Sequence, residues 1–152
     1  MDPGPYIAME LRQIFRDGIP SSPQRIVLAE EDPPAGRAPR MLTIFIGLSE
    51  TEALERAVKG IGTSRPLTHD LVLNALEALG GRLTRALVTA VENDTFHGAL
   101  EVTAPDGKKI YVDSRPSDAL VLAARRDVPI AVALSVLAES SGEGQGPPDE
   151  GG

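Results

Sequence analysis

Alternating apolar and polar residues predict three strands in the first third of the chain. Over residues 6–16, the larger apolar side chains Ile7, Met9 and Leu11 alternate with small or charged ones, which is typical of a strand. Two further strands are predicted over residues 25–30 and 40–48. The segment between them, residues 31–39, holds three prolines and a glycine, which predicts a loose hairpin loop.

The apolar spacing then changes to that of helices. Ser49 and Glu52 have the spacing of a capping box, in which the side chain of each residue binds the backbone of the other. The predicted N-caps are Ser49, Thr68 and either Ser114 or Ser117, and the predicted helices end at Gly60, Gly80 and about Arg126.

The second half of the chain predicts more hairpins. Strands are expected over residues 83–92, 98–103, 109–113 and 128–134, with turns at Asn93-Asp94 and at residues 105–108. The order of elements predicts an α+β fold, with a mostly antiparallel twisted sheet and about three helices in a single compact domain. The last strand, helix and strand can form a parallel crossover. We expect the domain to span residues 6–138, between a flexible N-terminus (1–5) and a disordered acidic Gly/Pro tail (139–152).

The charge of the chain argues against a broad nucleic-acid-binding surface. The net charge is −7, and the tail holds four acidic residues and no basic one, which leaves −3 for residues 1–138. With only two Tyr, three Phe and no Trp, a platform for base stacking is not expected. Any binding to nucleic acid should be weak and salt-sensitive. No apolar run reaches the roughly 18 residues that a membrane span needs, and no secretory segment is evident, so a cytoplasmic protein is expected.

Chemistry-bearing residues concentrate in two Arg-Pro segments. The segment from Val112 to Ala119 (VDSRPSDA) places two carboxylates, a guanidinium and a hydroxyl between a predicted strand and a helix. A helix N-terminus carries unpaired N–H groups and a partial positive charge, and it therefore favours anions. A similar segment, RPLTHDL, runs from Arg65 to Leu71.

Together with Asp94-Thr95-Phe96, Leu122-Ala123 and residues 128–130, these segments resemble the bifunctional nuclease family over about residues 6–138. The resemblance implies an α+β fold, a homodimer, and the RNase and DNase activity credited to plant members. The chain departs from the family pattern at His97 and Gly98, where Tyr and Ala are usual.

A nuclease of this kind suggests particular roles. Asp113 and Asp118 are candidate ligands of Mg²⁺ or Mn²⁺, which lower the pKa of a bound water. Arg65 and Arg115 can bind phosphate oxygens bidentately, and Ser117 can add a hydroxyl. No organic cofactor is expected.

Proton transfer is assigned to His69 with Asp70, because an imidazole exchanges its proton near neutral pH. A reaction without a metal would need a second acid or base beside His69, and His97 is a candidate. The same residues also have structural interpretations. In the first turn of a helix, a histidine such as His69 is more often a local hydrogen-bonding residue than a base, and Ser117 is better explained as a helix cap.

The carboxylates and arginines have such interpretations too. Asp118 can bind backbone N–H groups at a helix start. Arg115 can pair with Asp70 or Asp113, and Arg65 with Asp118, in an ionic network that fixes two helix starts. The alternative function is therefore a non-catalytic dimeric module that binds an anion or a partner's carboxylate.

Overall fold

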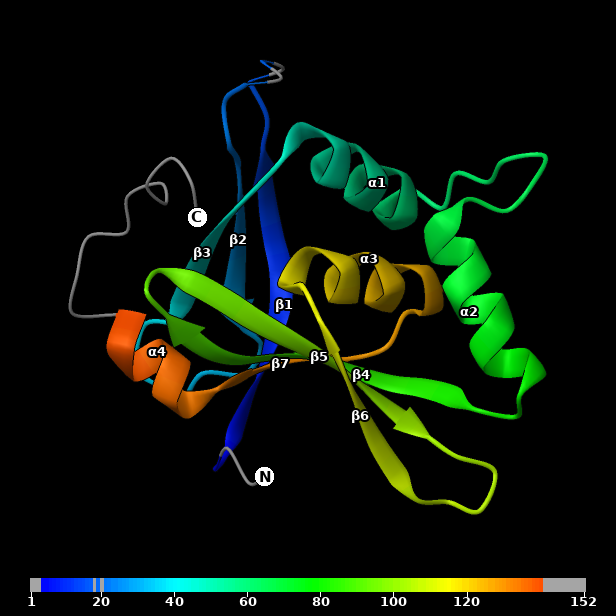
Figure 1. Ribbon diagram of the computed structural model, residues 1–152. Helices are drawn as coiled ribbons and strands as arrows, with labels where there is room; N and C mark the ends of the chain where they lie inside the picture. Colours follow the sequence, from blue (N-terminus) through cyan, green and yellow to red (C-terminus); the bar gives the residue numbers. More distant parts are fainter. Residues whose placement is uncertain (1–3, 18, 20, 141–152) are drawn as a thin grey trace.

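The fold is built on one seven-stranded sheet, seen in the computed structural model, which describes residues 4–17, 19 and 21–140 (Figure 1). The strands lie in the order β3-β2-β1-β7-β4-β5-β6. Their bounds are β1 (Tyr6–Phe15), β2 (Gln24–Glu30), β3 (Met41–Ile46), β4 (Arg82–Glu92), β5 (Thr95–Thr103), β6 (Lys109–Ser114) and β7 (Ile130–Ala133). The helices are α1 (Leu48–Val58), α2 (Thr68–Ala78), α3 (Pro116–Arg126) and α4 (Leu134–Ser140).

Two antiparallel groups of strands are joined through β7. Strands β1, β2 and β3 form one group, and β4, β5 and β6 form the other. Strand β7 pairs antiparallel with β1 and parallel with β4. Because β6 and β7 both run parallel to β4, α3 connects two parallel strands, as the crossover prediction required. The α+β class and the mostly antiparallel sheet are thus confirmed.

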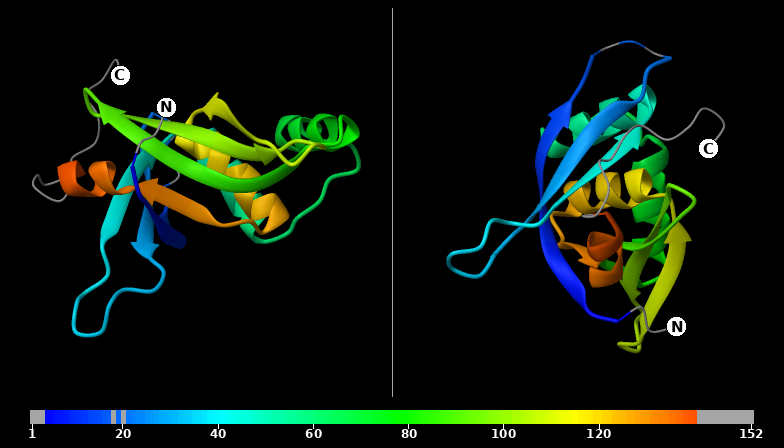
Figure 2. Two further views of the ribbon diagram at one scale, coloured as in Figure 1. Left: turned by 90° about the horizontal axis from the view of Figure 1, so that it is seen from below. Right: turned by 90° about the vertical axis from the view of Figure 1, so that its left-hand side faces the viewer.

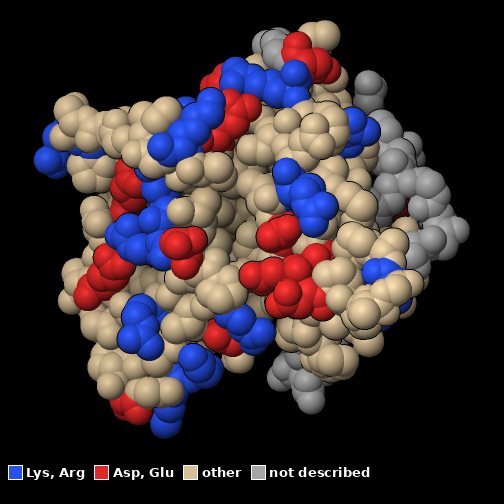
Figure 3. All heavy atoms as spheres, turned by 180° about the vertical axis from the view of Figure 1, so that it is seen from behind, with Lys and Arg blue, Asp and Glu red and all other residues tan. Residues whose placement is uncertain are grey.

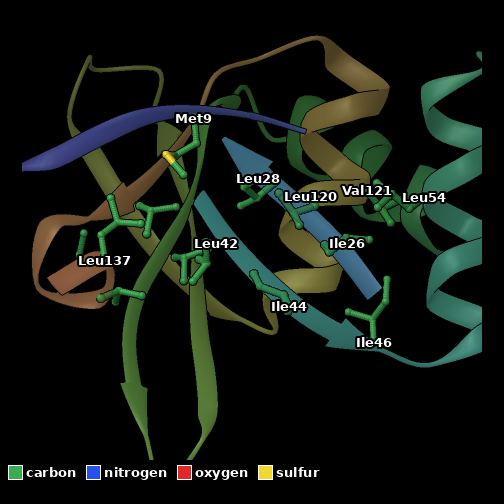
Figure 4. Close-up of a cluster of buried hydrophobic side chains, with 14 of the residues drawn as sticks. Met9, Ile26, Leu28, Leu42, Ile44, Ile46, Leu54, Leu120, Val121 and Leu137 are labelled. Atoms are coloured by element: carbon green, nitrogen blue, oxygen red, sulfur yellow. The ribbon is translucent and has the colours of Figure 1, made fainter. Parts of the chain in front are cut away.

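Helix α3 is the central packing element. Its Leu120 and Val121 belong to a hydrophobic cluster with β1, β2, β3, α1 and α4, in which side chains from these elements converge (Figure 4). Its Ala119, Leu122 and Ala123 belong to a second cluster with α2, β4 and β5. Burial on both sides holds α3 in place, so its N-terminus is a rigid platform for functional side chains.

All three predicted helix starts are shifted. The N-caps are Gly47, Leu67 and Arg115 rather than Ser49, Thr68 and Ser114 or Ser117, and no N-cap side chain makes a capping hydrogen bond. Residues within the first turn, and not the N-cap side chains, stabilise two of these helix starts. The Thr51 hydroxyl donates to the Gly47 carbonyl at 2.8 Å, and Pro116 begins α3 without an N–H group that would need a partner.

The C-terminal part adds an element that the sequence pattern did not predict. Residues 134–140 form α4, so the described chain has four helices and not about three, and β7 ends at Ala133. Residues 139 and 140 of the predicted tail belong to α4, whereas residues 141–152 and 1–3 lie outside the described residues. No helix of the described part is long and apolar enough to span a membrane.

Candidate functional site

The strand-to-helix junction of the second Arg-Pro segment lies directly against β5. A side chain at Gly98 would place its Cβ 3.0 Å from the Cα and N atoms of Pro116, so the absence of a side chain permits this close approach. The junction therefore sits on the sheet face that α3 covers. Figure 2 shows α3 in the two further views.

Side chains from three helices meet at the start of α3. The Nε and Nη2 atoms of Arg115 donate to the two carboxylate oxygens of Asp118 at 2.9 and 3.2 Å. His69 Nε2 lies 2.9 Å from Asp118 Oδ1. Arg115 Nη1 donates to Glu50 Oε1 of α1 at 3.3 Å. We call Glu50, His69, Arg115 and Asp118 the helix-start network.

The electrostatics of the helix-start network keep Asp118 ionised. Partial burial alone would raise the pKa of the Asp118 carboxyl, but hydrogen bonds from Arg115 and His69 outweigh it and lower the pKa below its usual value. The same contact to Asp118 raises the pKa of Arg115. The side chains of His69 and Asp118 are 25% and 32% exposed and that of Arg115 is 62% exposed, so solvent and a ligand can reach this network.

Asp70 serves a separate, structural contact. Its Oδ2 accepts a hydrogen bond from the N–H of Leu67 at 3.0 Å, which satisfies a free donor at the start of α2. Its Oδ1 lies 3.5 Å from Nε of Arg125, in the last turn of α3. Arg125 Nη1 also donates to the Ile61 carbonyl at 2.8 Å. These contacts fix the start of α2 against α3 and thereby position His69.

Asp113 is not brought to the helix-start network. It stands opposite Ala99 in the β5–β6 pairing, whereas Ser114 stands opposite Gly98. Paired residues share a sheet face and successive residues alternate. Because Gly98 faces Pro116 of α3, Asp113 points to the opposite face, where it is exposed.

The other predicted site residues also differ in their surroundings. Arg65 is exposed, and its guanidinium has no partner among the described residues. Ser117 is only 6% exposed, which disfavours direct contact with phosphate. His97 lies on the β4–β5 hairpin, 3.8 Å from Glu92, and has no contact with His69 in the described part of the chain.

Ion pairs do join the helix starts, but none of the predicted pairs is among them. Arg115 pairs with Asp118 and Glu50 rather than with Asp70 or Asp113, and Asp118 pairs with His69 rather than with Arg65. Sequence reasoning missed Glu50 and Arg125. Glu50 lies inside the segment assigned to a capping box, and no local pattern marks it as a partner of a residue 65 positions away.

The positions of Asp113 and Asp118 do not fit the metal-binding role predicted for them. Across residues 4–17, 19 and 21–140, no three His, Asp or Glu side chains gather as a metal ion would require. The two carboxylates point to different sheet faces, and both oxygens of Asp118 already accept hydrogen bonds. Binding of Mg²⁺ or Mn²⁺ stays a prediction.

The helix-start network can transfer a proton. An ionised carboxylate only accepts hydrogen bonds, so His69 Nε2 donates to Asp118 and Nδ1 is left to accept a proton. The carboxylate fixes the tautomer and the orientation of the ring, as in other Asp-His pairs. Three of the five N–H donors of Arg115 are used in the network, which leaves two for an anion.

Comparison with known proteins identifies the family. The model of the bifunctional nuclease domain matches residues 26–144. The uncharacterized proteins Rv1829 and MT1877, from two strains of Mycobacterium tuberculosis, are each 38% identical over 101 residues. The match covers 66% of this chain and 59% of each relative, so the chain spans less than two thirds of their length. The chain belongs to the bifunctional nuclease domain family.

Proposed function

We propose that this chain is a nuclease-like enzyme that cleaves phosphodiester bonds of RNA or DNA, with His69 as the proton-transferring residue. The observation that carries the proposal is the 2.9 Å contact between His69 Nε2 and Asp118 Oδ1, beside the partly free donors of Arg115. Family membership supports the substrate class.

The roles follow from what the reaction needs. Phosphodiester cleavage requires removal of a proton from the attacking oxygen and stabilisation of the charge on the phosphoryl oxygens. His69 Nδ1 takes a proton from the attacking water as the water oxygen bonds to phosphorus, and Asp118 holds the imidazole ring in place. The P–O bond to the leaving oxygen breaks, and His69 returns the proton to that oxygen. The free donors of Arg115 bind a phosphoryl oxygen, and the exposed Arg65 offers a second cation. Asp70 acts through the position of α2.

Binding of the nucleic acid should depend on few contacts. The chain carries a net charge of −7, and on the face shown in Figure 3 acidic and basic side chains lie next to one another. Few phosphates can therefore be neutralised at once, and affinity should be modest and should fall with salt.

The test compares His69 with the other histidine of the chain. The full chain, His69→Gln and His97→Gln would be incubated with labelled single-stranded RNA and DNA, in Mg²⁺, in Mn²⁺ and in EDTA. We expect His69→Gln to lower the cleavage rate at least about a hundredfold, the usual size of a general acid–base contribution. His97→Gln should leave the rate unchanged, since His97 lies outside the helix-start network.

Asp118→Asn supplies a second measurement in the same assay. It keeps the shape but removes the charge that orients His69, so cleavage should fall by a comparable factor. The melting temperature should change little, because partly exposed ion pairs contribute only about 0–1 kcal/mol. Cleavage that is equal in the wild type and in both variants would overturn the proposal and indicate a contaminant. Loss of wild-type cleavage in EDTA would add a metal to the mechanism.

One observation favours the alternative of a binding module without catalysis. Both oxygens of Asp118 are occupied by Arg115 and His69, as expected of a network that fixes helix starts. If the folded wild type cleaves neither RNA nor DNA under any of the three conditions, we assign the free donors of Arg115 to holding an anion or a partner's carboxylate.

A further inference from the structure

The open edge of the sheet at β6 has the properties of a self-pairing surface. Strand β6 is last in the sheet order, so one side of it has no neighbouring strand within the described chain. Its register with β5 is continuous over all six residues, and it contains no proline. Ile110, Tyr111 and Val112 are 49%, 57% and 43% exposed. Straight, apolar edges of this kind are ready to pair with another strand.

We propose that two copies of this chain pair antiparallel through β6, about a twofold axis at Tyr111. The pairing joins the two seven-stranded sheets into one continuous sheet. It gives a specific geometry to the homodimer expected from the family resemblance, and it does not depend on the proposed nuclease activity.

The backbone groups of β6 point alternately to β5 and to the open edge. The N–H of Ala104 donates to the carbonyl of Lys108 at 2.8 Å, which makes residues 104 and 108 a hydrogen-bonded pair at the end of the hairpin. Hydrogen-bonded and non-hydrogen-bonded pairs alternate along an antiparallel ladder. The register then directs the backbone groups of Ile110 and Val112 to β5, and those of Lys109, Tyr111 and Asp113 to the open edge.

The charges along β6 are complementary in this pairing. In a pairing centred on Tyr111, Lys109 stands opposite Asp113 of the second copy, and Asp113 stands opposite its Lys109. Side chains that face each other directly lie about 4.5–5.5 Å apart at Cβ, close enough for an ion pair. Asp113 has no side-chain partner among the described residues of its own chain. The Lys109 ammonium donates to Thr103 Oγ1 at 2.8 Å and lies 3.7 Å from Glu101 in its own chain, and its remaining N–H donor is available to Asp113 of the second copy.

The apolar residues match in the same register. Ile110 stands opposite Val112 of the second copy on the sheet face that α3 covers. The two Tyr111 residues stand opposite each other on the other face, where each hydroxyl donates to Glu101 of its own chain at 3.3 Å. The outward-facing backbone groups of Lys109, Tyr111 and Asp113 form hydrogen bonds with those of the same three residues in the second copy. Acid meets base and apolar side chain meets apolar side chain at every position from 109 to 113. The β6 strand of a second copy therefore matches this open edge at every position.

The experiment measures self-association of the full chain by sedimentation equilibrium. We expect a concentration-dependent dimer. Tyr111→Pro removes an N–H that faces the open edge and should abolish the dimer, whereas the fold, followed by circular dichroism, persists because proline is tolerated at such positions. Asp113→Lys sets two lysines opposite each other and should raise the dissociation constant at least about tenfold. The matched control, Glu92→Lys, makes the same charge change at a residue with a 73% exposed side chain outside β6 and should leave the dimer unchanged.

Mixing two variants tests the register itself. Lys109→Asp alone sets two aspartates opposite each other and should likewise raise the dissociation constant at least about tenfold. When Lys109→Asp and Asp113→Lys chains are mixed, each lysine faces an aspartate, and a heterodimer should form with about the affinity of the wild type. The proposal would be overturned by a wild type that is monomeric at all concentrations, or by a dimer that neither Tyr111→Pro nor Asp113→Lys weakens. If the wild type is monomeric, the open edge of β6 would be left for a strand of a different protein. If the dimer is unaffected by the substitutions, its interface lies on another surface of the chain.

Discussion

At the scale of single residues, the strongest expectation concerns Glu101 in the middle of β5. It is only 6% exposed, and it accepts hydrogen bonds from Arg85 at 2.7 and 3.0 Å and from Thr84 at 2.9 Å. Glu101→Gln would remove the charge that balances Arg85. We expect the free energy of unfolding, measured by urea denaturation, to fall by about 1–3 kcal/mol, the usual size of hydrogen bonds to charged groups.

Glu92→Gln is the control for this loss, because its side chain is 73% exposed at the end of β4. It should change the free energy of unfolding by less than about 0.5 kcal/mol. If the two variants unfolded at the same urea concentration, the Glu101 contacts would contribute nothing to stability.

The residue types of the site were predictable, but their partners were not. Arg115, Asp118 and His69 were expected to converge because their segments look like helix starts beside anion-binding chemistry, and they do converge. Glu50 could not be found because its contact with Arg115 depends on how α1 packs against α3, which no local spacing encodes. Asp113 was grouped with Asp118 because the two are close in sequence, whereas the alternation of strand residues separates them.

At the scale of elements, the hairpin turns offer a pair of opposite predictions. Asn93 and Asp94 both have positive φ, 51° and 62°, as a two-residue turn between β4 and β5 requires. Asp94→Gly should stabilise the protein by up to about 1 kcal/mol, since glycine adopts this conformation without strain. Gly107, in the next turn, has φ 88° and open space around its Cβ position. Gly107→Ala should destabilise the protein by about 1–2 kcal/mol through backbone strain alone.

Thermal unfolding of both turn variants checks the pair. A rise in melting temperature for Asp94→Gly and a fall for Gly107→Ala are expected. A fall for both would mean that the Asp94 side chain contributes more than the strain of its backbone costs.

The same local rules explain which elements were predictable. Turn residues and alternation predicted the β2–β3, β4–β5 and β5–β6 hairpins, because a hairpin is fixed by adjacent segments. The insertion of β7 between β1 and β4 was not predictable, since it joins strands more than 40 residues away. Helix α4 was missed because Leu134–Ser140 is short and follows a strand without an evident cap. The helix starts were misplaced because the rule for side-chain caps does not apply to Gly47, Leu67 or Arg115.

At the scale of the whole molecule, acid should loosen the fold from several places at once. Among the described residues, five carboxyl groups have a lowered pKa, and they are distributed over the hairpins and helices: Asp17, Glu30, Glu77, Glu101 and Asp118. Hydrogen bonds from Gln24, Arg37 and Arg126 are the main causes in the first three. In the other two, burial would raise the pKa, but hydrogen bonds, mainly from arginine, outweigh it.

The sign of the pH dependence follows from these shifts. A carboxyl group whose pKa is lower in the folded state binds fewer protons there than in the unfolded chain, so added acid favours unfolding. The stabilisation is complete above about pH 5 and is lost as the pH falls through the folded pKa values. We expect the urea midpoint, at one fixed protein concentration, to fall steadily from pH 5 to pH 3. Glu101→Gln should start from a lower midpoint and lose less over that range, because it lacks one of the titrating groups. A midpoint that stays constant down to pH 3 would show that these ion pairs do not stabilise the folded state.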